Sequence, residues 1–308
     1  MELPLSCLLT VNELLQNFIL IMKKSTLITV IICSILMNSC TMQKWQEEHL
    51  NSGRKQVLYR VHYGKYHRNV LDVALPKNRS KEKTPVVILI HGGAWVMGNK
   101  GYFSSFMKQC ADSGFACATI NYRYASGIFK VHHPDLPNDV LTAVNFISSK
   151  SDKWGVSDCR FGLAGHSAGA HLALTTSYML NTDNKIKACA SWAGPLNFID
   201  PDQLDIKTAH GIFSVYVGTT LSNASDTIKY KNASPFWLVK KNCVPTLLIY
   251  GVHDIGVPYS NAERFKSKLD SLSVPNTLVT FEKSGHIWTG KSLKKAKLKT
   301  IEWFKAKL

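Results

Sequence analysis

The chain has 308 residues, of which 45% are hydrophobic and 19% charged, and this balance excludes disordered and collagen-like classes. Its length suffices for one large domain with a substantial core. Lysine and arginine number 37 against 21 aspartate and glutamate. Because no zinc finger, RNA-binding signature or aromatic–basic interleaving accompanies this excess, we expect no nucleic-acid partner.

The first 40 residues have the pattern of an export signal. The basic segment 22–24 precedes "STLITVIICSILMNSC", in which about a dozen apolar residues lead to Cys40. That run is short for a membrane span, which needs about 20 apolar residues. The segment resembles a bacterial lipoprotein signal, although Met37 stands where such signals prefer leucine. We therefore expect a lipid anchor on Cys40 and a cell-envelope protein facing the periplasm or the exterior.

Two alternatives remain for this leader, namely a plain secretory signal and an uncleaved anchor. Residues 1–21 precede a better start at Met22 and are interpreted as an over-extended gene start. The domain proper is expected at residues 41–308.

The cysteines beyond Cys40 do not suggest a metal site. They are odd in number, and their spacing matches no metal-binding pattern, so we expect no metal. An oxidising compartment would allow a bridge between two of them, Cys110 and Cys117, but the sequence does not require it. The five residues are Cys110, Cys117, Cys159, Cys189 and Cys243.

Strand and helix patterns alternate from residue 56 onward, which predicts an α/β fold with a mainly parallel eight-stranded sheet covered on both faces. The first two strands read as an antiparallel pair joined by a turn. The expected strands are 56–64, 68–76, 84–93, 115–123, 159–165, 187–195, 245–254 and 276–286. The expected helices are 102–114, 136–150, 168–180, 260–272 and 291–308.

Two segments depart from this alternation. Residues 196–243 show no clear period and are interpreted as an insertion above the sheet, where a lid or substrate pocket is usual. The lysine-rich segment 291–308 has apolar residues near helical spacing. We expect it to pack on the sheet with a solvated lysine face, in preference to binding an anionic membrane or acidic polysaccharide. Its apolar residues are Leu293, Ile301, Phe304 and Leu308.

The stretch "GLAGHSAGAHLAL" at 162–174 runs an apolar strand into a helix through a G-x-S-x-G sequence. This pattern predicts a sharp strand-to-helix turn that exposes Ser167 as a nucleophile. Gly165 and Gly169 would then be needed because only small residues let the two arms approach each other.

A serine hydroxyl needs a histidine to take its proton and an acid to orient that histidine. Asp254 stands at the carboxyl end of the strand segment 245–254, and His286 stands at the carboxyl end of the segment 276–286. Because the carboxyl ends of parallel strands share one edge of a sheet, both can meet Ser167 there. The alternatives are that Asp254 is a turn residue, with His253 as the base, and that His286 is a surface histidine.

The sequence "LIHGGAW" supplies backbone donors for an oxyanion. We assign this role to the N–H groups of Gly93 and Ala94 in that loop and of Ala168 at the start of the following helix. His91 is expected to hold the loop in place. Two neighbouring residues, Trp95 and His166, are assigned to substrate binding.

Five motifs occur in the order found in one known superfamily. "HGGAW", "NYRY", "GHSAGAHLA", "GVHDIGVP" and "SGHIW" resemble the hormone-sensitive-lipase-like and carboxylesterase branch of the α/β-hydrolases over residues 55–305. The first and third are most similar to bacterial esterases of the acetyl-xylan or feruloyl type and to kynurenine formamidases. Ala94 departs from the third glycine of many members, and "NYRY" departs from the lipase-like D-Y-R-x-A-P-E. Arg123 in "NYRY" is expected to form a structural ion pair with Asp139.

The resemblance implies a serine esterase with an acyl-enzyme intermediate and no metal or organic cofactor. It also implies short-chain or carbohydrate-linked ester substrates outside the cytoplasm. One alternative is an amide or peptide hydrolase, including a formamidase, with the same three residues. Another is a non-catalytic envelope binding protein on a hydrolase scaffold. The sequence leaves the oligomeric state open.

Overall fold

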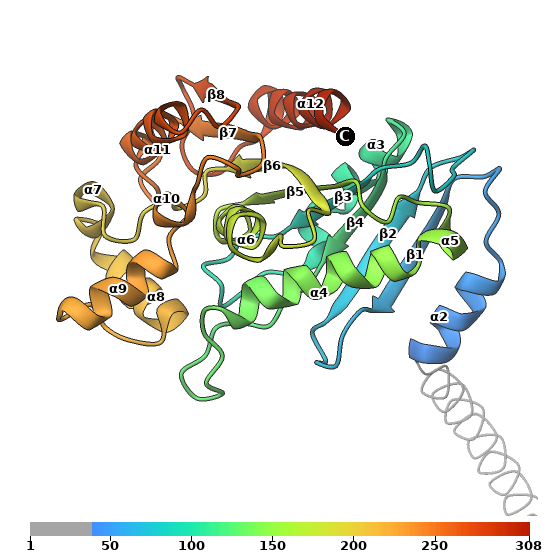
Figure 1. The fold of residues 1–308 in the computed structure, drawn as a ribbon, viewed down its shortest axis with the longest axis horizontal. Coiled ribbons are helices and arrows are strands. Elements are labelled where there is room, and N and C mark those ends of the chain that lie inside the picture. Colours follow the sequence, from blue (N-terminus) through green and yellow to red (C-terminus); the bar gives the residue numbers. More distant parts are fainter. Residues whose placement is uncertain (1–38) are drawn as a thin grey trace, which may run out of the picture.

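The computed structural model describes residues 39–308, which form an eight-stranded sheet with helices on both faces (Figure 1). The strand order is β1-β2-β4-β3-β5-β6-β7-β8, and β2 runs antiparallel to both of its neighbours while the strands from β3 to β8 are parallel. The predicted mainly parallel eight-stranded sheet is therefore confirmed. The strands are β1 (Gln56–His62), β2 (Val70–Leu75), β3 (Val86–Ile90), β4 (Ala116–Ile120), β5 (Phe161–His166), β6 (Ile186–Trp192), β7 (Thr246–Gly251) and β8 (Asn276–Phe281).

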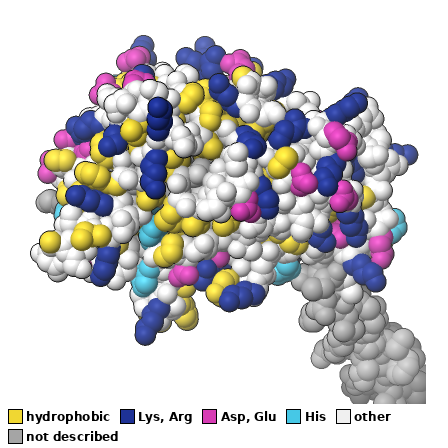
Figure 2. All heavy atoms as spheres, viewed as in Figure 1, with side chains coloured by type: hydrophobic (Ala, Val, Ile, Leu, Met, Phe, Trp, Pro, Cys, Tyr) yellow, Lys and Arg dark blue, Asp and Glu magenta, His cyan; other side chains and the backbone are white. Residues whose placement is uncertain are grey.

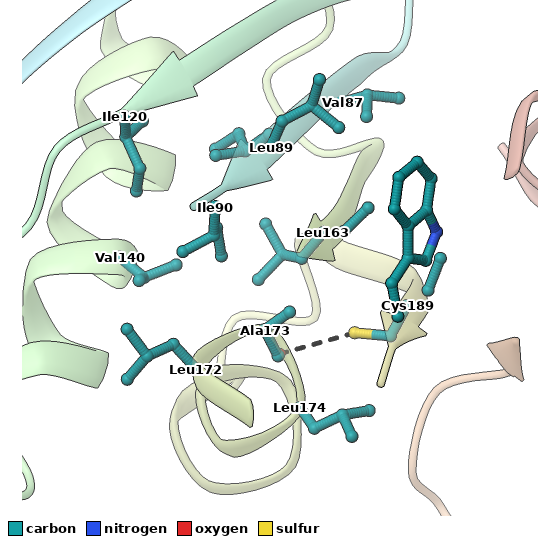
Figure 3. Packing of buried hydrophobic residues seen from close by; sticks show 14 of the residues in the cluster. Val87, Leu89, Ile90, Ile120, Val140, Leu163, Leu172, Ala173, Leu174 and Cys189 are labelled. Atoms are coloured by element: carbon teal, nitrogen blue, oxygen red, sulfur yellow. Dashed lines mark hydrogen bonds between the residues drawn. The ribbon is translucent and has the colours of Figure 1, made fainter. Parts of the chain in front are cut away.

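The apolar runs of the central strands are explained by burial on both faces. Every residue of β3, β4 and β5 is buried, as expected for strands covered by helices on each side. Figure 3 shows the packing on one side, where Ile90 and Leu163 of the sheet lie near Val140 and Leu172 of two covering helices. This core holds the ends of β3 and β5 side by side, with Ile90 paired to Gly165.

Helices α3 and α12 lie together on one face of the sheet, whereas α4 and α6 lie on the other (Figure 1). Helix α11 joins the second group, since its Phe265 ring packs 6.3 Å from that of Tyr178, just after α6. The helices outside the insertion are α2 (Ser39–Glu48), α3 (Ser104–Asp112), α4 (Asp135–Ser149), α5 (Ser151–Trp154), α6 (Ala168–Thr175), α11 (Tyr259–Ser271) and α12 (Gly290–Lys307), with short turns η1 (Lys100–Phe103) and η2 (Thr176–Leu180).

The lysine-rich helix α12 packs on the sheet through one face. Ala296, Thr300 and Phe304 are buried, and the Thr300 hydroxyl accepts a hydrogen bond of 2.9 Å from the Trp192 indole. On the face seen in Figure 2, Lys and Arg side chains are spread among acidic and polar ones rather than gathered in one patch.

Residues 196–243 connect β6 to β7 and, despite their lack of a clear sequence period, contain four helices. These helices have 4 to 11 residues, so their stability depends more on tertiary packing and capping than on a repeating apolar pattern. The Asp200 side chain accepts from Asp202 N at the start of α7, and that of Asn223 accepts from Asp226 N at the start of α9. The helices are α7 (Pro201–Leu204), α8 (Lys207–Val217), α9 (Ala224–Asn232) and α10 (Pro235–Leu238).

Helix α2 covers the free edge of β1. The Gln46 side chain accepts from Tyr59 N at 2.6 Å and donates to Tyr59 O at 3.0 Å, so it pairs with the strand as a neighbouring backbone would. The predicted leader at residues 1–40 lies outside the described residues except for its last two positions, which begin α2. Among the described residues, no helix is both long and apolar enough to cross a membrane.

Candidate active site

Ser167 stands alone between β5 and α6, with backbone angles φ 54° and ψ −123°. This is a strained conformation for a residue with a side chain. The two glycines explain how it is reached. A β-carbon on Gly165 would lie 2.3 Å from the carbonyl carbon of Gly169, and one on Gly169 would lie 2.1 Å from the Ile90 oxygen. The strand and helix can therefore meet closely only because both positions are glycine.

Three side chains from separate strand ends form one hydrogen-bonded chain. His286 Nε2 lies 2.9 Å from Ser167 Oγ, and His286 Nδ1 lies 2.8 Å from Asp254 Oδ2. A carboxylate accepts only, so the contact assigns the imidazole proton to Nδ1 and leaves Nε2 to accept from the serine hydroxyl. His253, the alternative considered for the base, is exposed, and Asp254 is the residue that contacts His286.

The Asp254 carboxylate is held from two sides. Its Oδ1 accepts from Gly256 N and Val257 N, each at 2.8 Å, while Oδ2 faces His286. The side chain is fully buried. Charge-assisted hydrogen bonds of this kind fix the direction of the carboxylate, so the "GVHDIGVP" turn orients the acid as well as supplying it.

The loop after β3 brings backbone amides to the same place. Gly93, Ala94 and Trp95 follow one another with positive φ angles of 115°, 49° and 63°. A β-carbon on Gly93 would lie 2.3 Å from the Met97 oxygen, so this position requires glycine. Within residues 39–308 the N–H groups of Gly93 and Ala94 have no acceptor. Ala94 lines the same cavity as Ser167, as does Ala168, whose amide opens helix α6.

This cavity has a volume of about 340 Å³ and is bounded by the loop after β3, the turn after β7 and the insertion. Its size is near the lower limit for small-molecule sites. Most of the wall is apolar, and about half of its residues lie outside the sequence motifs. The apolar side chains from the insertion are Ile206, Ala209, Ile212 and Phe213, and those from the acid turn are Ile255 and Val257.

Trp95 lines the cavity but is mainly a packing residue. It is 2% exposed, and its ring stacks on Tyr216 of α8 at 4.6 Å. The ring also makes edge-to-face contacts with His171, Phe198 and Phe213, with 5.1 to 6.1 Å between the ring centroids. Trp95 therefore joins the loop after β3 to the insertion, and its expected contact with the substrate stays a prediction.

His166 does not take the place expected for a substrate-binding residue. It is 6% exposed and does not line the cavity. Its Nε2 lies 2.9 Å from the backbone oxygen of His286, and burial lowers the pKa of the imidazole to about 4. The ring is therefore neutral at pH 7, and its N–H donates to that carbonyl and fixes the turn carrying His286. His166 is the last residue of β5, and its ring contacts Tyr102 and the backbone of His286 rather than the cavity.

His91 and Arg123 have structural contacts. His91 Nδ1 lies 2.7 Å from Gly92 O and its ring stacks on Tyr122 at 4.4 Å, and burial lowers its pKa to about 4. Arg123 donates to both Asp139 oxygens, at 2.9 and 3.0 Å. Among the described residues, no group of histidine, cysteine and acidic side chains could hold a metal ion.

The sheet order and the elbow carrying Ser167 define an α/β-hydrolase, and comparison with known proteins narrows the class. Esterase LipC of Mycobacterium tuberculosis is 29% identical over 231 residues, covering 70% of this chain and 55% of the relative. A probable isoprenylcysteine alpha-carbonyl methylesterase of Oryza sativa subsp. japonica is 27% identical over 251 residues, covering 75% and 58%. The chain spans little more than half the length of these curated relatives. Both relatives are named as esterases.

Solved structures agree in fold. A truncated carbohydrate esterase from gut microbiota aligns with a TM-score of 0.69 at 20% identity, over 83% of this chain and 98% of its own. Esterase B of Lactobacillus rhamnosis aligns with a TM-score of 0.68 at 18% identity, over 90% and 96%. The sequence profile of the BD-FAE family matches residues 71–269, more than half of the 308 residues. The chain belongs to this family.

Proposed function

We propose that this chain hydrolyses carboxylic esters through an acyl-enzyme intermediate on Ser167. The observation that carries the proposal is the continuous chain of contacts from Ser167 Oγ through His286 to Asp254, at 2.9 and 2.8 Å. These are the distances at which a base can take a proton from a nucleophile and an acid can orient that base.

In the first half-reaction, Ser167 Oγ attacks the ester carbonyl while His286 Nε2 takes the hydroxyl proton. The buried Asp254 carboxylate stabilises the imidazolium that forms. His286 then gives this proton to the departing alcohol as the bond between the carbonyl carbon and the alcohol oxygen breaks. The acyl group remains on Ser167. Water attacks the acyl-enzyme in the second half-reaction, with His286 again as base and then acid, which releases the carboxylic acid and restores the serine.

Negative charge on the former carbonyl oxygen needs donors that are already in position. Within the described residues the amides of Gly93 and Ala94 have no acceptor, and Ala94 and the first residue of α6, Ala168, line the cavity that contains Ser167, so these amides are the proposed donors. Each donor of this kind is worth about 10²–10³ in kcat. No metal or organic cofactor takes part in this scheme.

The cavity supports a short acyl group. At about 340 Å³ with an apolar wall, it suits a group of a few carbons better than a long fatty chain. We favour carbohydrate esters as the natural substrates. One protein of similar fold is named a carbohydrate esterase, and the expected location of this chain is outside the cytoplasm.

Hydrolysis of p-nitrophenyl acetate and butyrate by the full-length chain tests the proposal. Wild-type protein should release p-nitrophenol, and Ser167→Ala should lose at least about 10³-fold in kcat while remaining folded by circular dichroism. A folded Ser167→Ala variant that retains most of the activity would refute the serine mechanism. Cleavage of matched N-acyl anilides in place of the esters would favour the amide-hydrolase alternative, and no turnover of either would favour a binding protein.

We further propose that the enzyme is lipid-anchored in the cell envelope through Cys40. The proposal rests on the basic and apolar segments that precede this residue. In a bacterial host fed a labelled fatty acid, wild-type protein should incorporate label and Cys40→Ala should not. Label retained in Cys40→Ala would contradict the anchor, whereas a secretory signal would give an unlabelled, exported wild type.

A further inference from the structure

Gln203, on α7 of the insertion, is a buried polar residue in the wall of the cavity. Its side chain is 1% exposed, and it lines the same space as Ser167 and His286. The amide nitrogen Nε2 donates to Gly256 O at 3.1 Å, whereas the amide oxygen Oε1 has no hydrogen-bond partner among the described residues. A side-chain amide has two N–H donors and one oxygen that can accept two hydrogen bonds. The ability of Gln203 to accept is therefore unused here.

The orientation of this amide is determined by its surroundings. Gly256 O can only accept, so the nitrogen must face it and the oxygen must lie on the other side. The same Gly256 donates its N–H to Asp254, which ties Gln203 to the turn carrying the acid.

Helix α7 itself is clamped in place. Arg264 of α11 donates to both oxygens of Asp200, at 2.6 and 2.7 Å, and to Asp202 at 2.7 Å. Asp200 is 2% exposed and also caps α7 through Asp202 N. Gln203 is thus presented by a fixed element rather than by a loop free to turn the amide toward solvent.

A buried acceptor without a donor is costly, and native proteins leave few of them. The side chains that line the cavity together with Gln203 are mostly apolar. A donor group of a ligand would therefore pair with Oε1 where little water competes for the hydrogen bond. Trp95 also lines the cavity, and its buried Nε1 likewise has no partner within residues 39–308. A hydroxyl, which can both donate and accept, suits a wall that offers one unused acceptor and one unused donor.

We propose that Gln203 is a specificity residue whose Oε1 accepts a hydrogen bond from a hydroxyl group of the ester substrate. This inference rests on the proposed esterase function and names its substrate class as hydroxylated esters. The hydroxyl can belong to the acyl group or to the alcohol. Gln203 does not take part in bond breaking, and its donation to Gly256 is a separate, positioning contact.

Matched ester pairs test the proposal with the full-length wild-type chain. For the acyl side, p-nitrophenyl 3-hydroxybutyrate is compared with p-nitrophenyl 3-methylbutyrate, which replaces the hydroxyl by a methyl group of similar size. For the alcohol side, 2-hydroxypropyl butyrate is compared with isobutyl butyrate. In one of the two pairs, kcat/KM should be about tenfold or more higher for the hydroxylated ester, since losing the donor leaves a buried acceptor unpaired.

Gln203→Met removes the acceptor at nearly constant volume. In this variant the ratio of kcat/KM for the hydroxylated ester to kcat/KM for its methyl counterpart should fall to about one or below. Loss of the contact with Gly256 would slow both esters of a pair equally and cancels in the ratio. The control Gln109→Met, at an exposed position on α3, should leave the ratio unchanged.

Ratios near one in both wild-type pairs would overturn the proposal, as would a preference that persists in Gln203→Met. If that variant does not fold, the wild-type ratios still decide the outcome. Failure of the esterase function is distinguishable, because then neither member of any pair is hydrolysed in a Ser167-dependent way.

Discussion

Replacing Asp254 by asparagine is expected to lower kcat by about 10⁴-fold while leaving the fold in place. The reason lies in the two amides that hold this side chain. Gly256 N and Val257 N both donate to Oδ1, so an asparagine would place its oxygen there and its NH₂ group toward His286. A donor at that position forces the imidazole proton onto Nε2, which then can no longer accept the proton of Ser167.

The measurement is kcat for p-nitrophenyl butyrate together with the thermal unfolding midpoint. Asp205→Asn serves as a matched control, because Asp205 is exposed at the end of α7 and should tolerate the change. A folded Asp254→Asn enzyme within tenfold of the wild-type kcat would show that Asp254 does not orient the base.

The second large effect is on stability. Gly169→Ala should lower the free energy of unfolding by about 3 kcal/mol or more, from a total that is typically about 5–15 kcal/mol. The added β-carbon would lie 2.1 Å from Ile90 O and 2.4 Å from His91 O. Both neighbours are backbone atoms at the end of β3, so α6 must move away from the sheet. This movement would displace Ser167 and the amide of Ala168, and activity should be lost with stability.

Gly211→Ala on α8 is the control for this substitution. A β-carbon on Gly211 meets nothing within 4 Å, and alanine in a helix is favoured over glycine by about 0.5–1 kcal/mol, so this variant should be as stable as wild type or more so. Urea unfolding of both variants measures the difference. A Gly169→Ala protein within about 1 kcal/mol of wild type would mean that the elbow does not need its close approach.

The sheet could be predicted because the buried strands appear in the sequence as apolar runs. Continuous apolar runs such as 86–90 are buried on both faces, and the alternation with helices specifies a parallel arrangement. All the predicted strands except 159–165 were too long at their carboxyl ends: the segment expected as 276–286 pairs only to Phe281. The remaining residues form the turn that delivers His286.

The insertion was harder to predict because its helices are short and lack a strong apolar period. Two start signals were nonetheless present, namely Asp200 before a proline and Asn223 three residues before Asp226. Applying them would have located α7 and α9. They would not have located the cavity wall, because the insertion residues in that wall lie on α7, on α8 and between them, and their placement depends on contacts with α11 and the loop after β3.

Site residues inside motifs were predicted by type, but their orientation was not. Proximity to Ser167 suggested substrate contact for His166, whereas its ring holds the backbone of His286. Trp95 is likewise buried against α8. Gln203 belongs to no motif, and only its burial in the cavity wall distinguishes it. Which way a side chain points depends on packing partners distant in sequence, and no local pattern encodes that.

Ser167 is expected to carry the covalent intermediate. The most direct measurement is to treat the full-length protein with a p-nitrophenyl alkylphosphonate, which leaves a stable adduct on an activated serine, and to locate the added mass by peptide mass spectrometry. We predict one adduct per chain, on the peptide containing Ser167, with none in Ser167→Ala and slow formation in Asp254→Asn. An adduct on another residue, or none on a folded protein that hydrolyses esters, would contradict the account.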